Sequence, residues 1–244
     1  MVVRVEVCVT SVQEAIAAAS AGADSVELCT WLAVGGVTPS WGLAHAVHRQ
    51  VPIDVRVLVR PSPGPFHYSL PELDALLHDT RTYSSNGMGV VTGALGPEGE
   101  WDDDTMRQIR TAAGSAELTF HRAIDHAMDP FLIAERCAAM GIQRILTSGG
   151  ASTALEGAAS LRELIRCAPG VRIAAGGGVR PGNVVELVER SGVEEVHFSA
   201  QRWVSSPSGG PALGGDAALA NAAVEADLAR IEGVLNALTK AGLR

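Results

Sequence analysis

The chain repeats one pattern eight times: a short run rich in β-branched residues, a turn, and a longer stretch with helical periodicity. The strand-like runs are Val3–Val9, Ser25–Leu28, Ile53–Val59, Met88–Val91, Glu117–Phe120, Gln143–Leu146, Val171–Ala175 and Glu195–Phe198. The helical stretches are Val12–Ser20, Pro39–Arg49, Leu70–Tyr83, Asp104–Ala113, Pro130–Met140, Leu155–Cys167, Gly182–Glu189 and Ala217–Leu238. Strands that alternate with helices in this way predict βαβ units and a parallel sheet.

Eight such pairs predict a single α/β domain over residues 1–244, a (β/α)8 TIM barrel whose closed parallel sheet has the helices outside. The length of 244 residues and the 47% hydrophobic content suit that fold. A doubly wound open sheet is the rival, but the first strand-to-helix turn, Val9-Thr10-Ser11, lacks the glycine fingerprint of dinucleotide-binding folds. A flexible loop is expected at 205–215, where Ser, Gly and Pro dominate.

Charge and composition exclude several functions. The net charge of −8, without a basic run, argues against nucleic acid and anionic membranes as partners. No apolar run approaches the roughly 18 residues of a membrane span, and Arg4 and Glu6 interrupt the first apolar stretch, so we expect a cytoplasmic protein with free thiols. Lys240 is the only lysine, which argues against Schiff-base chemistry. We expect no organic cofactor.

The phase of the first two strands brings cysteines and carboxylates together. Alternate side chains of a barrel strand face the interior, so Glu6 and Cys8 share one face of the first strand, and Glu27 and Cys29 share one face of the second. Two thiols at the ends of neighbouring strands can hold one soft ion, Cu(I) or Zn²⁺. The alternative is that both cysteines are small buried hydrophobes.

Other strand ends also carry polar groups. They are Arg60, then His121 with Arg122 and Asp125, then Ser148, and finally His197 with Ser199. Together with Glu6 and Glu27 they have the parts of an acid–base site with anion-binding groups. The alternative is a salt-bridged network inside the barrel. Gly176, Gly177 and Gly178 follow the seventh strand, where they could cradle a phosphate or merely permit a tight turn.

At these residues the sequence resembles the CutC-type copper homeostasis proteins. The motifs that carry the resemblance are Glu6-Val7-Cys8, the segments 22–29 and 35–40, Arg60-Pro61, Tyr68-Ser69, the segments 91–95, 119–125 and 146–149, Gly176-Gly177-Gly178-Val179, and His197-Phe198-Ser199-Ala200. The resemblance runs from about Glu6 to Ala200.

The resemblance implies a TIM barrel, a cytoplasmic setting, a homodimer or homotetramer and a role in copper handling. It also implies that Cys8 and Cys29 are the copper ligands, because they match the family's two proposed Cu(I) ligands. The sequence departs from the family pattern at residues 62–66 and 206–211, where charged groups are missing from loops expected at the active face.

Two functions follow as hypotheses. The first is a copper-binding protein with Cys8 and Cys29 as metal ligands. The second is an isomerase, lyase or hydrolase for a small polar or phosphorylated metabolite, with Glu6, Glu27, His121 and Arg122 as catalytic candidates. Its predicted substrate- and anion-binding residues are Arg60, Asp125, Ser148, Gly176, Gly177, Gly178, His197 and Ser199. A purely structural role is less favoured, because a scaffold has no need to bury polar groups at so many strand ends.

Overall fold

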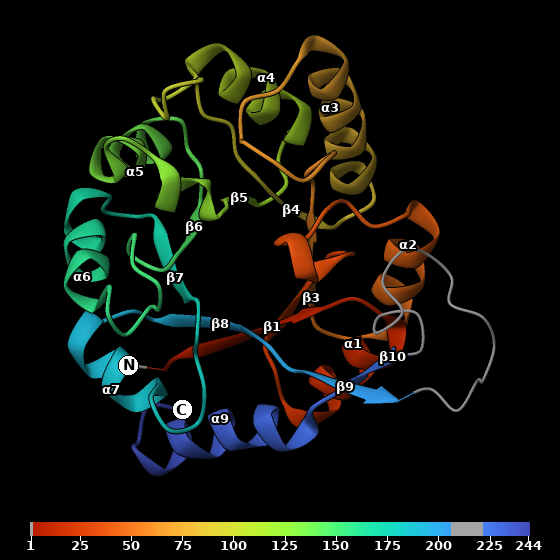
Figure 1. Cartoon of the computed structure of the whole chain (residues 1–244), viewed down its shortest axis with the longest axis vertical. Coiled ribbons are helices and arrows are strands. Elements are labelled where there is room, and N and C mark those ends of the chain that lie inside the picture. The colour runs from red at the N-terminus through yellow and green to blue at the C-terminus, as the bar shows by residue number, and fades with distance from the viewer. Residues whose placement is uncertain (1, 206–221) are drawn as a thin grey trace.

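The computed structural model describes residues 2–205 and 222–244. Eight parallel strands close into a barrel in sequence order, each paired with the next and β8 with β1 (Figure 1). The strands are β1 (Arg4–Val9), β2 (Ser25–Leu28), β3 (Asp54–Leu58), β4 (Gly89–Thr92), β5 (Leu118–Phe120), β6 (Arg144–Thr147), β7 (Arg172–Gly176) and β8 (Glu195–Ser199). The predicted (β/α)8 barrel is therefore confirmed.

The α-helices form the outer ring of the barrel (Figure 1). They are α1 (Val12–Ala21), α2 (Trp41–Gln50), α3 (Leu70–Ser85), α4 (Asp103–Ala113), α5 (Pro130–Ala139), α6 (Ala158–Cys167), α7 (Val184–Ser191) and α9 (Leu228–Lys240), with short 3-10 turns η1 (Leu32–Val34) and η2 (Arg122–His126). Side-chain caps start several of them: Ser11 accepts from the backbone of Glu14, and Asp102 accepts from that of Thr105.

The alternation of side chains divides each strand between two environments. Val5, Val7 and Val9 of β1 belong to the main hydrophobic core, whereas Cys8 belongs to a separate small cluster inside the barrel. The fully buried Glu6 forms ion pairs with arginines of β3 and β6. Because successive residues of a strand point to opposite faces, the apolar face meets the helices and the polar face fills the barrel.

The C-terminal region differs from the sequence prediction. The helical stretch expected at Ala217–Leu238 instead contains a strand, β10 (Ala222–Ala226), which pairs antiparallel with β9 (Gln201–Ser205), and helix α9 starts only at Leu228. The prediction was wrong because alanine favours helices in isolation, whereas here the neighbouring β9 backbone supplies ladder hydrogen bonds. Of the loop expected at 205–215, Ser205 ends β9 and the rest lies outside the described residues.

Three smaller differences lie at helix starts. Helix α2 begins at Trp41 rather than Pro39, α6 at Ala158 rather than Leu155, and α7 at Val184 rather than Gly182. The residues just before α6 and α7 form turns instead. These loops stand at the carboxyl ends of the strands, so they shape the wall of the barrel mouth.

Candidate functional site

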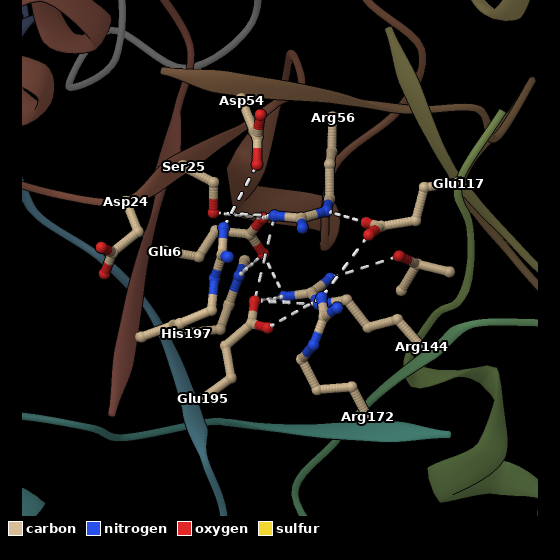
Figure 2. Close-up of polar contacts among 12 residues, drawn as sticks. Glu6, Asp24, Ser25, Asp54, Arg56, Glu117, Arg144, Arg172, Glu195 and His197 are labelled. Carbon is tan, nitrogen blue, oxygen red and sulfur yellow. Dashed lines mark hydrogen bonds and ion pairs between the residues drawn. The ribbon is translucent and has the colours of Figure 1, made fainter. Parts of the chain in front are cut away.

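Figure 2 shows an ion network inside the barrel, formed by side chains from the first three residues of their strands and by Glu117, which precedes β5. Glu6 accepts from Nη1 of Arg56 at 2.6 Å and from Nη2 of Arg144 at 2.5 Å. Arg144 also pairs with Glu195 at 2.7 Å, while Glu117 bridges Arg56 and Arg172. Burial opposes ionisation of Glu6, but Arg144 and Arg56 hold its pKa well below the usual value.

This network accounts for Glu6 without a catalytic role. Its carboxylate is fully buried, and both oxygens are engaged by arginines, by the hydroxyl of Ser25 and by Nδ1 of His197. Such a carboxylate fixes the position of its neighbours and has no free oxygen for a substrate. The salt-bridged interior anticipated as an alternative is therefore present, and it lies beneath the mouth.

A cavity of about 500 Å³ opens above the network, at the carboxyl ends of the strands. Nine of the residues singled out from the sequence line this cavity. Those that line it are Cys8, Glu27, Arg60, His121, Arg122, Gly177, Gly178, His197 and Ser199. A volume of this size is typical of small-molecule sites.

The two predicted metal ligands lie side by side. Sγ of Cys8 and Sγ of Cys29 are 3.6 Å apart, and Cys8 reaches the cavity while Cys29 is fully buried behind it. They share a small apolar cluster with Leu58 and Val91. The hydrogen bond between the thiols, burial and the nearby Glu27 raise the pKa of Cys8 well above its usual value.

A mixed set of ligand atoms adjoins the thiols. Sγ of Cys8, a carboxylate oxygen of Glu27 and a ring nitrogen of His197 all lie within 4.8 Å of one another. Nδ1 of His197 bonds to Glu6 at 2.9 Å, an arrangement that orients metal-binding histidines in many proteins. The donor set of thiol, imidazole and carboxylate suits a transition metal ion.

Glu27 stands in the cavity wall with an unused oxygen. Its side chain is 5% exposed, and Oε2 has no hydrogen-bond partner in the described part of the chain. Burial is the main cause that raises the pKa of Glu27, with a contribution from the charge of Glu6 and opposition from His197. A buried carboxyl with a raised pKa and an unused oxygen is a candidate for proton transfer to and from a bound molecule.

His121 faces Glu27 across the mouth, because it follows β5 whereas Glu27 lies on β2. Nδ1 of His121 accepts from the backbone N–H of Ala123 at 3.3 Å, so the neutral ring carries its proton on Nε2. Burial and the charge of Arg60 lower the pKa of His121 to about 3. Nε2 is buried without a partner among the described residues, and it is therefore a hydrogen-bond donor in need of an acceptor.

Arg60 is only partly available as an anion-binding group. Its two terminal nitrogens donate to the backbone oxygens of Val34, Gly36 and Gly64 at 2.9–3.0 Å, which ties together the loops after β2 and β3. The guanidinium also lies over the ring of Phe66, 5.1 Å from its centroid. Phe66 belongs to the stretch that departs from the family pattern, and its ring meets that of His121 edge-on.

Arg122, Asp125 and Ser148 form one connected group. Nε of Arg122 donates to Asp125 at 2.7 Å, and Nη2 donates to Ser148 at 3.0 Å. Asp125 also accepts from the backbone N–H groups of Ser148 and Gly150. Asp125 and Ser148 thus orient Arg122, which is the member of this group that lines the cavity.

The glycines after β7 leave room for this arginine. A Cβ on Gly177 would lie 3.3 Å from Cβ of Ser148 and 3.7 Å from Nη1 of Arg122, and Gly177 and Gly178 have φ of +111° and +70°. A Cβ on Gly176 would meet Leu146 at 2.8 Å inside the barrel. Gly176 is thus required for packing, while Gly177 and Gly178 line the mouth.

Sequence reasoning missed Arg230, which also lines the cavity. It lies in the first turn of α9, in the segment read as part of one long helix. Only the start of α9 at Leu228, after the β9–β10 hairpin, brings this side chain to the mouth. No motif around Arg230 signals its position, although its spacing from Asp227, the helix cap, is visible in the sequence.

A family model and two curated relatives all point to the same protein family. The model of the CutC family matches residues 3–202. A CutC family protein of Pectobacterium atrosepticum is 42% identical over 205 residues, which cover 84% of this chain and 81% of the relative. A CutC family protein of Xylella fastidiosa is 44% identical over 218 residues, with 86% and 82% covered.

Two solved structures share the overall fold of this chain. CutC of Streptococcus agalactiae, named as a candidate copper homeostasis protein, superposes with a TM-score of 0.75 at 28% identity, over 80% of this chain and 98% of its own. Phosphoribosylanthranilate isomerase of Thermotoga maritima gives a TM-score of 0.58 at 16% identity, over 98% and 99% of the two chains. That second likeness concerns the barrel fold alone.

Proposed function

The chain belongs to the CutC copper homeostasis family, and from that premise we propose that it binds a soft metal ion at the barrel mouth, with Cu(I) as cargo and Cys8 and Cys29 as ligands. The observation that carries the proposal is the 3.6 Å separation of the two sulfurs beside the cavity. Thiolate sulfur is the ligand that Cu(I) prefers in proteins.

The surroundings of the thiols support this assignment. Leu58 and Val91 pack with the two cysteines in one apolar cluster, which shields the sulfurs from water on the side away from the cavity. On the open side, Glu27 and His197 offer an oxygen and a nitrogen within 4.8 Å of Sγ of Cys8. Glu27 and His197 are thus placed to supply a third ligand to an ion bound by Sγ of Cys8.

An anaerobic Cu(I) titration in competition with a chelator tests the proposal. We expect one ion per chain, and we expect Cys8→Ala and Cys29→Ala each to weaken binding by more than about tenfold, because a single thiol cannot match two. Cys167→Ala is the matched control, since Cys167 is the partly exposed cysteine and lies in α6, away from the mouth. Unchanged affinity and stoichiometry in the first two variants would falsify the proposal.

A second function is favoured by a separate observation: Glu27 and His121 line the same cavity, and each has a buried polar atom without a partner among residues 2–205 and 222–244. We infer acid–base catalysis on a small polar metabolite. Glu27 would take a proton from a carbon beside a carbonyl group, His121 would donate a hydrogen bond from Nε2 to the carbonyl oxygen, and Glu27 would return the proton. A carboxylate base opposite a neutral histidine is a known arrangement for such chemistry.

Exchange of solvent deuterium tests the second function. A panel of sugars, sugar phosphates and hydroxy acids is incubated with the protein in D2O and followed by NMR. We expect deuterium to enter one carbon of a compound that binds, and Glu27→Gln to abolish the exchange. The absence of exchange in every compound that binds would contradict this function.

Cellular location and assembly remain predictions. No helix of the described residues is long and apolar enough to cross a membrane. We propose a cytoplasmic homodimer or homotetramer, in line with the family resemblance. Light scattering at several protein concentrations measures the assembly, and a monomer throughout would contradict it.

A further inference from the structure

The charge of the cavity wall differs in sign from that of the whole protein. The chain carries a net charge of −8. Around the mouth, however, the arginines Arg60, Arg122 and Arg230 line the cavity, and Glu27 is the one carboxylate among the described lining residues. A concave wall of this kind concentrates positive potential, because its low dielectric focuses the field into the opening.

Among the described residues, the Arg230 guanidinium makes fewer hydrogen bonds than those of Arg60 and Arg122. Nη2 donates to the backbone oxygen of Val179 at 3.0 Å, which holds the guanidinium against the loop after β7. Its Nε is buried without a partner, and no carboxylate oxygen of the described residues lies within 4.0 Å of its guanidinium nitrogens, although Asp227 caps its backbone N–H. A guanidinium that is fixed by one hydrogen bond and unpaired in charge is suited to receive an anion.

Arg122 is held on the neighbouring side of the same opening. Asp125 and Ser148 engage its Nε and Nη2, whereas Nη1 points to Gly177, where a side chain would stand 3.7 Å away. The ion pair with Asp125 orients the guanidinium, so less conformational entropy is lost when a ligand binds. Arg122 and Arg230 thus flank Gly177 and Gly178.

His121 supplies a third, uncharged contact. The residue is only 4% exposed, and its Nε2 donor has no hydrogen-bond partner among the described residues. A buried donor without an acceptor costs free energy. A ligand oxygen within hydrogen-bond distance of Nε2 would remove that cost. The wall thus offers two cationic contacts on one side and a neutral donor on another.

We propose that the mouth binds a small organic anion, with a phosphate or carboxylate group held by Arg122 and Arg230 and a carbonyl or hydroxyl oxygen held by Nε2 of His121. The inference rests on the second proposed function, that the cavity takes a small molecule, and it names the class of that molecule. A ligand with both groups fits a cavity of about 500 Å³.

Calorimetric titration of the full chain with four probes tests the inference. Inorganic phosphate, ribose 5-phosphate and citrate separate phosphate from carboxylate ligands, and ribose is the uncharged control. We expect saturable binding of at least one anion and none of ribose. Arg230→Gln and Arg122→Gln should each weaken that binding by about tenfold or more, because each removes a charge-assisted hydrogen bond.

Matched variants assign the contacts. Arg166→Gln removes an exposed arginine of α6 and should leave binding unchanged. His121→Gln should weaken binding of ribose 5-phosphate or citrate more than that of inorganic phosphate, because the histidine contacts the organic part. Circular dichroism melting of each variant separates lost binding from lost folding.

The outcomes separate this inference from the second proposed function. Lack of saturable binding for all three anions up to about 10 mM, or unchanged binding in Arg230→Gln, overturns the inference. Anion binding that Arg230→Gln weakens, without deuterium exchange in any compound, upholds the inference and removes the catalytic function. Deuterium exchange in an uncharged sugar, without binding of any anion, would uphold the catalytic function and overturn the anion-binding inference.

Discussion

Arg144 and Glu6 form a fully buried ion pair in the centre of the barrel, with Nη2 of the arginine 2.5 Å from Oε1 of the carboxylate. The two residues lie on β6 and β1, on different sides of the closed sheet. Removal of water from both charges is costly, so each depends on the other and on Glu195 and Arg56 for compensation.

Replacement of Arg144 by methionine is expected to destabilise the protein by about 3–5 kcal/mol, because it leaves Glu6 and Glu195 buried with less compensating charge. Urea unfolding measures the change. Arg190→Ala is the control: its pair with Glu186 is 54% and 56% exposed and contributes less than about 1 kcal/mol. Equal effects of the two substitutions would contradict this account of the network.

Two histidines of the mouth should titrate in opposite directions. Burial and the charge of Arg60 lower the pKa of His121 to about 3. Burial also opposes ionisation of His197, but Glu27 and Glu6 more than offset this and raise its pKa. NMR of ring-labelled histidine should show a neutral His121 with its proton on Nε2 at mildly acidic pH. Glu6→Gln should lower the pKa of His197, and an unchanged pKa would contradict the assignment.

The low pKa of His121 also bears on stability. In the unfolded chain the group titrates near 6.5, whereas in the folded protein it titrates at about 3. The unfolded state therefore binds the extra proton first, and stability is lost as the pH falls from 6.5 toward 3. Urea midpoints across this range should fall less steeply for His121→Gln than for the wild-type chain. Parallel curves would show that the histidine is not buried in neutral form.

Copper affinity should rise with pH. The thiols must lose their protons to bind Cu(I), and the raised pKa of Cys8 means that this thiol is still protonated at neutral pH. Each proton released adds up to about a tenfold gain in affinity per pH unit. Chelator competition between about pH 6 and pH 8 measures the slope, which Cys8→Ala should reduce. A flat profile would show that the ion is not bound by these thiols.

Gly36 should control the position of the second thiol. Its φ is +86°, and a Cβ there would lie 2.7 Å from Leu58 and 3.3 Å from Sγ of Cys29. We expect Gly36→Ala to destabilise the protein by about 1–3 kcal/mol and to weaken Cu(I) binding, because the Cys29 sulfur must shift.

Gly42→Ala is the matched control for this substitution. Gly42 lies in the first turn of α2, where a Cβ would meet no atom within 4 Å. Alanine there should leave copper binding unchanged and stabilise the helix by up to about 1 kcal/mol. If both variants bind Cu(I) with the affinity of the wild type, the position of the Cys29 sulfur does not determine the copper affinity.

Much of the fold could be predicted because its signals are local. Eight strand-and-helix pairs are visible as changes of hydrophobic period, whereas several helix starts were set by caps that the period does not show, as at Ser40 before α2. The strand phase placed Cys8 beside Cys29 and Glu27 near the mouth, because the period of a strand is fixed at two residues. The same reasoning failed at β10, where pairing with β9 overrides the helical preference of an alanine-rich segment.

The amino-acid order thus determined the barrel, the inward face of each strand and the pairing of two sulfurs on neighbouring strands. Tertiary structure alone decided that the Glu6 carboxylate is paired with arginines 50 and 138 residues away in the chain. It also decided that the side chain of Arg230 reaches the mouth from α9. It further decided that Nε2 of His121 is buried without an acceptor in the part of the chain that the structure describes. The physical reason is that burial and charge compensation depend on groups brought together only when the sheet closes, whereas backbone period depends on the nearest neighbours in the chain.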